Sequence, residues 1–207
     1  MKIRLSRAER QAQTRNDLLE AAARLFVKRG FEGASIEAIT EQAGYTRGAF
    51  YSNFGSKAEL FAELLQQRAY KAYRGMAEAS VQGKRSSPRE TGEELAAIQA
   101  NEDGRWLFRL WLELLAHAGR DEKFRVLAGG FWSTTRDLMT QAIGDAYDEA
   151  GRKPPAPPDR LATAMIAMDI GLALQHFVDP DAVPLSAYPE LYDAVFGPLA
   201  PPTAAGG

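Results

Sequence analysis

Apolar residues recur along this chain at intervals of three and four positions, a spacing that predicts helices over nearly its whole length. Alternation with a period of two, which would indicate β-strands, is nearly absent. The first apolar stripe forms one face of an amphipathic helix and consists of Leu18, Leu19, Ala22, Leu25 and Phe26. Ser6 and Glu9 form a candidate capping box before it, and Gly30 supplies a stop after it. We therefore expect a first helix at about residues 7–29.

Two short helices are expected next, separated by a turn at Gly44. Ser35 is a candidate N-cap for the first of them and Thr46 for the second, which should occupy about residues 47–53. Helices of about eight residues are not stable alone, so we expect both to pack against the first helix in a three-helix helix-turn-helix module. The side chains of the second short helix that we expect to stay exposed are Arg47, Tyr51 and Asn53.

A longer helical region follows this module. The segment Ser56-Lys57-Ala58-Glu59 is a capping box directly before a new apolar stripe and predicts a fourth helix that reaches about residue 79. Residues 82–92 contain glycine, serine and proline and are expected to form a loop. Further helices are expected at about residues 93–102, 105–118, 121–150, 159–178 and 188–196.

The whole pattern predicts an all-α protein of about nine helices. Residues 1–57 would form the helix-turn-helix domain, residues 58–200 a larger helical domain and residues 201–207 a disordered tail. The helix at about 159–178 differs from the others because apolar residues cover most of its circumference. We expect it to be buried on nearly all sides, either at the centre of its own domain or partly against a second copy of the chain.

Composition excludes several classes of protein. The 207 residues include no cysteine, and the two histidines, His117 and His176, are not at metal-ligand spacing. Disulfides, thiolate catalysis and cysteine-based zinc sites are therefore excluded, and no motif indicates an enzyme, a metal site or a cofactor. No run approaches the roughly 18 apolar residues that span a bilayer, so we expect a cytoplasmic protein without membrane association.

Charge is unevenly distributed along the chain. Residues 1–57 contain 10 Lys and Arg against 6 Asp and Glu, a net charge of +4, whereas residues 58–207 contain 15 against 21, a net charge of −6. A basic module on an acidic body suggests that the first part binds a polyanion. Chance alone also produces splits of this size, so the charge pattern needs the support of a motif.

Such a motif lies at Gly44–Lys57. Its sequence, GYTRGAFYSNFGSK, resembles the helix-turn-helix signature of the tetracycline-repressor (TetR) family of bacterial transcriptional regulators. Segments similar to the same family, at matching distances, precede it at Leu18–Phe26, Gly30-Phe31 and Ser35–Ile39. The resemblance covers about residues 10–61, and Asn53 stands where the family more often has histidine. It implies a DNA-binding regulator, usually a repressor.

In a helix-turn-helix module, a short helix enters the major groove and reads bases while flanking groups contact phosphates. Arg47 can present two donors to guanine, and Lys57 can meet a phosphate at the start of the fourth helix. The candidate DNA-binding residues are Ser35, Thr46, Arg47, Gly48, Ala49, Tyr51, Ser52, Asn53 and Lys57. If Arg47 does not contact DNA, we expect it to be an ordinary solvated surface residue. The corresponding alternative for Tyr51 is a core residue of the module. Two alternatives remain for the basic N-terminal residues, which either contact the minor groove or form a frayed, solvated end: Lys2, Arg4, Arg7 and Arg10.

One module contacts too few bases for selectivity, so we expect a homodimer on a pseudo-palindromic double-stranded operator, with half-sites about 34–36 Å apart or a multiple of that. By the resemblance, two late helices of each subunit form the dimer interface as a four-helix bundle, here at about 159–178 and 188–196. The rival hypothesis is a helical protein that binds a small molecule or a partner and whose helix-turn-helix does not bind DNA.

The resemblance also implies a small-molecule inducer, which binds in the larger domain and releases the operator. Aromatic and methionine side chains there suit a mostly apolar ligand. The candidate ligand-binding residues are Trp106, Trp111, His117, Phe131, Trp132, Met165 and Asp169. Asp169 lies within an otherwise apolar helix and needs a partner where it is buried, either a ligand amine or an arginine across the dimer.

Overall fold

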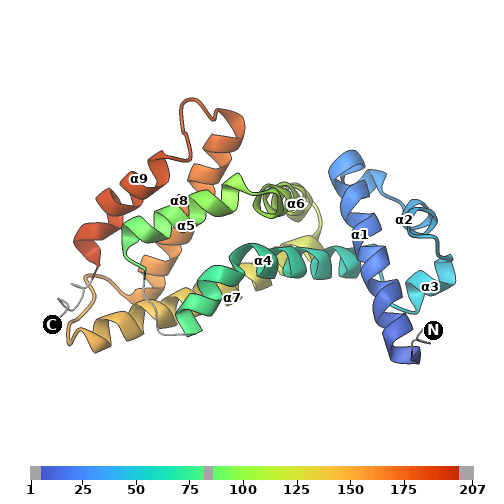
Figure 1. Cartoon of the computed structure of the whole chain (residues 1–207), viewed down its shortest axis with the longest axis horizontal. Coiled ribbons are helices and arrows are strands. Elements are labelled where there is room, and N and C mark those ends of the chain that lie inside the picture. Colours follow the sequence, from blue (N-terminus) through green and yellow to red (C-terminus); the bar gives the residue numbers. More distant parts are fainter. Residues whose placement is uncertain (1–5, 82–85, 201–207) are drawn as a thin grey trace, which may run out of the picture. The chain divides into compact units, whose positions relative to one another are not determined.

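The computed structural model describes residues 6–81 and 86–200, apart from the side chains at 74, 75 and 77–81. This part of the chain contains α-helices and one short 3₁₀ helix but no strand, which confirms the predicted all-α class (Figure 1). The predicted tail at 201–207, Lys2 and Arg4 lie outside the described residues. The helices are α1 (Arg7–Gly33), α2 (Ile36–Ala43), α3 (Arg47–Tyr51), α4 (Lys57–Val81), α5 (Pro88–Ala100), α6 (Glu102–Ala118), α7 (Glu122–Glu149), α8 (Pro158–Val178), α9 (Ala187–Phe196) and the 3₁₀ helix η1 (Gly197–Leu199).

The helices divide into two compact units. The first contains the chain up to Lys71 together with Trp106–Arg125, and the second contains Ala72–Arg105 and the chain from Val126 onward. Most of α6 therefore packs with α1, α2, α3 and the first half of α4. The domain boundary expected at residue 57 stays a prediction, because the first unit extends beyond it.

Aromatic rings form the core of the first unit. The centroid of the Phe31 ring lies 5.5 Å from Phe26, 5.3 Å from Phe61 and 4.8 Å from Phe124, distances at which aromatic pairs attract one another. Phe31 follows Gly30, where α1 leaves helical geometry with φ 71° and ψ 173°, a conformation that glycine adopts without strain. The helix end that the sequence predicts at residue 29 corresponds to this kink. The further helical turn that follows, up to Gly33, is not predicted from the sequence.

Helices α5, α8 and α9 enclose the core of the second unit. Its buried residues are Leu95, Ile98, Leu172, Tyr188, Tyr192 and Phe196. Helices α5 and α9 lie side by side (Figure 1), and the backbone of α9 lies close to Gly92 of α5. A Cβ atom at Gly92 would lie 2.7 Å from the carbonyl oxygen of Tyr188, so this approach requires a residue without a side chain.

The start of α5 corrects the prediction of a loop at residues 82–92. The helix already begins at Pro88, because Ser87 and Glu90 form a complete capping box and proline is favoured in the first helical turn. The Ser87 hydroxyl accepts a hydrogen bond from the Glu90 N–H, and the Glu90 carboxylate accepts one from the Ser87 N–H. The sequence Ser-Pro-Arg-Glu contained this signal, and the composition of the surrounding segment obscured it.

Helix α8 is much less buried in the single chain than expected. Its buried residues are Ala162, Leu172 and Ala173, whereas Leu174 is 44% exposed and Val178 is 73% exposed. The expectation of burial on nearly all sides is therefore wrong for one copy of the chain. Among the described residues, α8 is also the one helix long and apolar enough to cross a membrane, which is weak evidence because core helices of soluble proteins pass the same test.

Candidate nucleic-acid interface and ligand-binding residues

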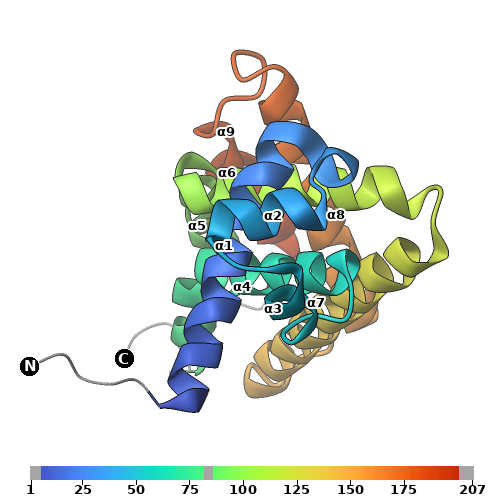
Figure 2. The same ribbon diagram turned by 90° about the vertical axis from the view of Figure 1, so that its right-hand side faces the viewer.

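The Phe50 side chain anchors α3 in the core of the first unit. The Phe50 side chain is fully buried, and its ring lies 5.7 Å from that of Phe54. Both N-caps predicted for the short helices are present: the Thr46 hydroxyl accepts from the Ala49 N–H at 3.3 Å, and the Ser35 hydroxyl accepts from the Ala38 N–H at 3.1 Å. Figure 2 shows the arrangement of α1, α2 and α3 within the first unit.

Arg47 and Tyr51 are exposed on the outer face of α3. The Arg47 guanidinium lies 2.8 Å from the Glu37 carboxylate and donates a long hydrogen bond of 3.4 Å to the Tyr51 hydroxyl. The hydroxyl of Tyr51 and, to a lesser extent, the charge of Glu37 raise the pKa of Arg47. The guanidinium is therefore held in place between α2 and α3 by contacts that water screens and that another anion or a base edge can replace.

Ser52 and Asn53 use their donors within the module. The Ser52 hydroxyl donates to the Gly48 carbonyl, and the Asn53 amide donates to the Ala49 carbonyl, each at 2.8 Å. Asn53 is half-buried, and its side-chain oxygen is buried without a hydrogen-bond partner in the described chain. The expectation that Asn53 is exposed is therefore wrong, because its amide folds back onto the end of α3.

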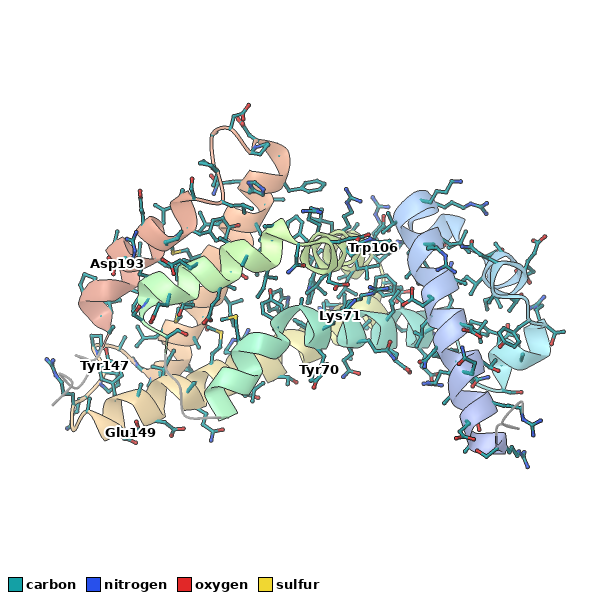
Figure 3. The ribbon with its side chains drawn as sticks, viewed as in Figure 1. Tyr70, Lys71, Trp106, Tyr147, Glu149 and Asp193 are labelled. Carbon is teal, nitrogen blue, oxygen red and sulfur yellow. The ribbon has the colours of Figure 1, made fainter. Side chains whose placement is uncertain are left out.

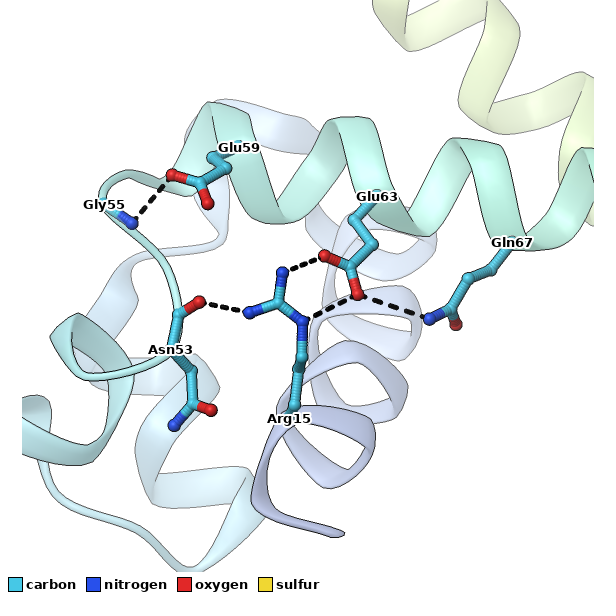
Figure 4. A network of polar contacts seen from close by, with 6 residues as sticks. All are labelled: Arg15, Asn53, Gly55, Glu59, Glu63 and Gln67. Atoms are coloured by element: carbon cyan, nitrogen blue, oxygen red, sulfur yellow. Dashed lines mark hydrogen bonds and ion pairs between the residues drawn. The ribbon is translucent and has the colours of Figure 1, made fainter. Parts of the chain in front are cut away.

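Arg15 fixes the segment after α3 to two other helices (Figure 4). Its guanidinium makes two hydrogen bonds to the Glu63 carboxylate on α4 and one to the Asn53 carbonyl. The guanidinium carbon also lies 4.2 Å from the centre of the Phe54 ring, a cation–π distance. This bidentate contact holds α1, α4 and the turn after α3 in one register. The sequence gives no local sign of it, since Arg15 and Glu63 are 48 positions apart.

Lys57 is half-buried at the start of α4. Its ammonium group donates to the Phe31 carbonyl at 2.7 Å and lies 4.2 Å from the centre of the Phe31 ring. Burial lowers the pKa of Lys57, while the charge of Glu32 opposes that shift. Because an ammonium has three donors, one contact with Phe31 leaves capacity for a phosphate, but it also gives Lys57 a structural role that sequence reasoning missed.

The remaining DNA-binding candidates differ in exposure. Gly48 is exposed and Ala49 is half-buried, so the outer face of α3 carries little side-chain bulk between Arg47 and Tyr51. Arg7 and Arg10 lie at the exposed start of α1. A duplex can therefore approach the backbone of α3 closely.

The candidate ligand-binding residues do not fall in one unit. Trp106, Trp111 and His117 on α6 belong to the first unit, whereas the others belong to the second, namely Phe131, Trp132, Met165 and Asp169. Trp106 on α6 lies near α4, where the guanidinium of Arg68 is 5.5 Å from the centre of its ring (Figure 3). Phe131 and Trp132 pack edge to face at 5.5 Å. These seven residues remain candidates.

His117 and Glu113 on α6 contact the kink of α1. The Glu113 carboxylate accepts a hydrogen bond of 3.1 Å from the Phe31 N–H, which the kink has released from the helix. The His117 ring lies 5.1 Å from the Phe31 ring, and its two nitrogens are each 3.7 Å from a carboxylate, those of Glu32 and Glu113. His117 therefore joins α6 to the helix-turn-helix module, a role that its sequence context did not reveal.

Asp169 is half-buried in the second unit, on the turn of α8 that faces the core residue Leu172. Burial raises its pKa to about 6, and its Oδ1 atom is buried without a hydrogen-bond partner in the described part of the chain. Burial together with the charge of Asp169 also raises the pKa of three tyrosines, those of Tyr73, Tyr188 and Tyr192. Sequence reasoning missed these tyrosines, although the spacing 188, 192, 196 places aromatic rings on one face of α9.

Two protein families match this chain. Residues 18–64 match the family described as bacterial regulatory proteins, tetR family, and residues 95–196 match the one described as BetI-type transcriptional repressor, C-terminal.

Among curated proteins, the transcriptional regulator TtgR of Pseudomonas putida is 46% identical over 63 residues, which is 30% of each chain. The transcriptional repressor AcnR of Corynebacterium efficiens is 36% identical over 61 residues, 30% of this chain and 32% of AcnR. The transcriptional repressor NicS of P. putida is 35% identical over 92 residues, 44% of this chain and 42% of NicS. The aligned segments thus span less than half the length of these relatives.

Solved structures share the fold over most of the chain. GusR of Salmonella enterica is 19% identical with a TM-score of 0.75, over 90% of this chain and 95% of GusR. A transcriptional regulator of Saccharomonospora viridis in complex with choline is 20% identical with a TM-score of 0.68, over 90% of this chain and 96% of that one. The shared fold therefore extends well beyond the segments that align with TtgR, AcnR and NicS.

Proposed function

Because this chain belongs to the tetR family of bacterial regulatory proteins, we propose that it is a cytoplasmic transcriptional repressor that binds a pseudo-palindromic operator as a homodimer and is released by a small molecule. The matched families and relatives are transcriptional regulators rather than enzymes. Repression agrees with AcnR and NicS, which are both transcriptional repressors.

The arrangement of α3 is the observation that carries the proposal. Phe50 anchors one side of the helix in the core, and Arg47 and Tyr51 project from the other side with only Gly48 and Ala49 between them. A helix with a buried aromatic anchor and an exposed arginine suits insertion into the major groove. The network around Arg15 supports it by fixing the turn after α3 to α1 and α4.

Replacing Arg47 by alanine is expected to weaken operator binding by about 1–3 kcal/mol per half-site, because a bidentate contact to guanine is lost. Binding to random DNA should change much less. The operator is first recovered by selection from random fragments, and both affinities are then measured by fluorescence anisotropy at one salt concentration.

Arg160→Ala is the matched control for this experiment. Arg160 is also exposed and lies beside an acidic residue, with its Nε 3.6 Å from the Asp159 carboxylate, but it belongs to the second unit. We expect its operator affinity to equal that of the unmodified protein. Equal losses on operator and random DNA after Arg47→Ala would assign Arg47 to phosphate contact, and no sequence preference in the unmodified protein would favour the rival function of a helical binding protein that does not bind DNA.

The exposed apolar residues of α8 and α9 support the homodimer. Leu174 is 44% exposed and Val195 is 48% exposed in the single chain, and two interacting copies would remove such surface from water. Choline binding by the S. viridis neighbour supports the part of the proposal that concerns a small molecule.

Leu174→Arg and Val195→Arg are each expected to convert a dimer into a monomer at micromolar concentration, because an unpaired charge would be buried in the interface. The monomer should lose at least tenfold in operator affinity, since it engages one half-site. Sedimentation equilibrium measures the association. Val126→Arg on α7, at a valine that is 65% exposed, should remain dimeric, and monomeric unmodified protein would contradict this assignment.

A further inference from the structure

One carboxylate oxygen and one phenol hydroxyl are buried without partners in the second unit. The Oδ1 atom of Asp169 on α8 and the hydroxyl of Tyr188 on α9 are both inaccessible to water, and neither has a hydrogen-bond partner among the described residues. Buried polar atoms are nearly always hydrogen-bonded, and each exception requires an explanation. Two such atoms from neighbouring helices are the strongest unexplained feature of this unit.

The surroundings of Asp169 are aromatic and apolar. Tyr73 on α4 and Tyr188 and Tyr192 on α9 pack in one cluster with Met165, Met168 and Leu172, the residues that flank Asp169 on α8. Burial and, to a lesser extent, the charge of Asp169 raise the pKa values of the three tyrosines. The pKa of Asp169 itself is raised by burial, and no described cation lowers it. The Tyr192 hydroxyl donates a long hydrogen bond of 3.4 Å to the Met165 carbonyl rather than to the carboxylate. The site holds a negative charge that nothing described compensates.

The position of Asp169 on α8 argues for a partner inside the same subunit. One turn away on either side, Met165 and Leu172 share its face of the helix, and both pack in the core formed by α5, α8 and α9. The exposed residues Leu174 and Val178 lie on the opposite face of α8. An arginine from a second copy bound to that exposed face would not meet Asp169.

We propose that Asp169, together with Tyr73, Tyr188 and Tyr192, binds a small organic cation, and that this cation is the inducer. The half-buried Asp169 carboxylate supplies the counter-charge, and tyrosine rings attract tertiary and quaternary ammonium groups through their π-electrons. The unpaired Tyr188 hydroxyl is available for a polar group of the ligand. The inducer role rests on the proposed function, whereas cation binding stands by itself.

Calorimetric titration of the full chain without DNA tests the binding site. The probes are choline, tetramethylammonium and ethanolamine as chlorides, together with the neutral alcohol in which a tert-butyl group replaces the trimethylammonium group of choline. We expect at least one cation to bind and the neutral isostere to bind at least tenfold more weakly. Absence of binding by all three cations at millimolar concentration, or equal binding of the isostere, would overturn the proposal.

Variants connect the binding to the named residues. Asp169→Asn should weaken cation binding at least tenfold, whereas Asp159→Asn, at an exposed position on the same helix, should leave it unchanged. Tyr188→Phe removes a hydroxyl that has no partner among the described residues, so the fold should persist while affinity for choline falls several-fold. Unchanged affinity in a folded Asp169→Asn protein would exclude the carboxylate as the counter-charge.

The pH dependence gives an independent measurement. Because the cation needs the ionised carboxylate and the pKa of Asp169 is about 6, affinity should rise about tenfold between pH 5 and pH 7 and then level off. The rise should be absent in Asp169→Asn. Operator affinity is measured separately with and without the cation, since linkage requires an inducer to weaken it. Cation binding without any effect on the operator would overturn the inducer role alone.

Discussion

Gly92→Ala is expected to lower the free energy of unfolding of the second unit by about 3 kcal/mol or more. The new methyl group would lie 2.7 Å from the Tyr188 carbonyl oxygen and 2.8 Å from the Pro189 Cα. Both are backbone atoms that cannot rotate away, so α5 and α9 would have to separate, and overpacking of this kind is costly. Chemical denaturation followed by circular dichroism measures the change.

Gly129→Ala is the matched control for Gly92→Ala. Gly129 is exposed within α7, and apart from the backbone of its own helix no described atom lies within 4 Å of a Cβ at that position. Alanine is favoured over glycine inside helices by up to about 1 kcal/mol, so this variant should be slightly more stable than the unmodified protein. Normal stability of Gly92→Ala would contradict the close approach of α5 and α9.

Asp169→Asn is expected to stabilise the ligand-free protein at neutral pH, although it should weaken the proposed cation binding. The pKa of Asp169 rises from 3.8 to about 6 on folding, so between these values the folded state binds a proton that the unfolded state has lost. Stability therefore falls as pH rises from about 4 to 6, by up to about 3 kcal/mol. The variant lacks this loss and should exceed the unmodified protein in stability at pH 7.5.

The comparison at pH 4 completes this experiment. There the carboxyl is protonated in the folded protein, so the stability difference between the two proteins should largely disappear. Thermal and urea unfolding at both pH values measure the difference, with Asp159→Asn as the control that shows no such pH dependence. A variant that is less stable than the unmodified protein at pH 7.5 would show that a partner stabilises the Asp169 carboxylate.

The elements that sequence predicted correctly are those with local signals. The caps at Ser6, Ser35 and Thr46 are all present, and each depends on residues within three positions along the chain. The start of α5 was missed although its capping box is equally local, because glycine and serine before it suggested a loop. The accuracy of the predicted helix boundaries was thus limited where two local signals indicated different structures.

The candidate sites were predicted less completely than the helices. Arg47 and Tyr51 are exposed as expected, since the apolar pattern of α3 determines its buried side. The contact of Arg15 with Glu63, the structural role of His117 and the tyrosines around Asp169 depend on residues far apart in the chain. No periodicity encodes such contacts, which arise from the way in which the helices pack.

The hydrogen bond from the Phe31 N–H to Glu113 has a consequence for the construction of hybrid regulators. A fusion of residues 1–71 to the body of a different family member would remove Glu113 and His117 and leave the released amide of α1 without its acceptor. Trp106–Arg125 belongs to the same compact unit as the N-terminal helices. A first unit that is to be transferred to another regulator therefore consists of two segments of the chain, and exchange of the first segment alone would separate parts that pack together.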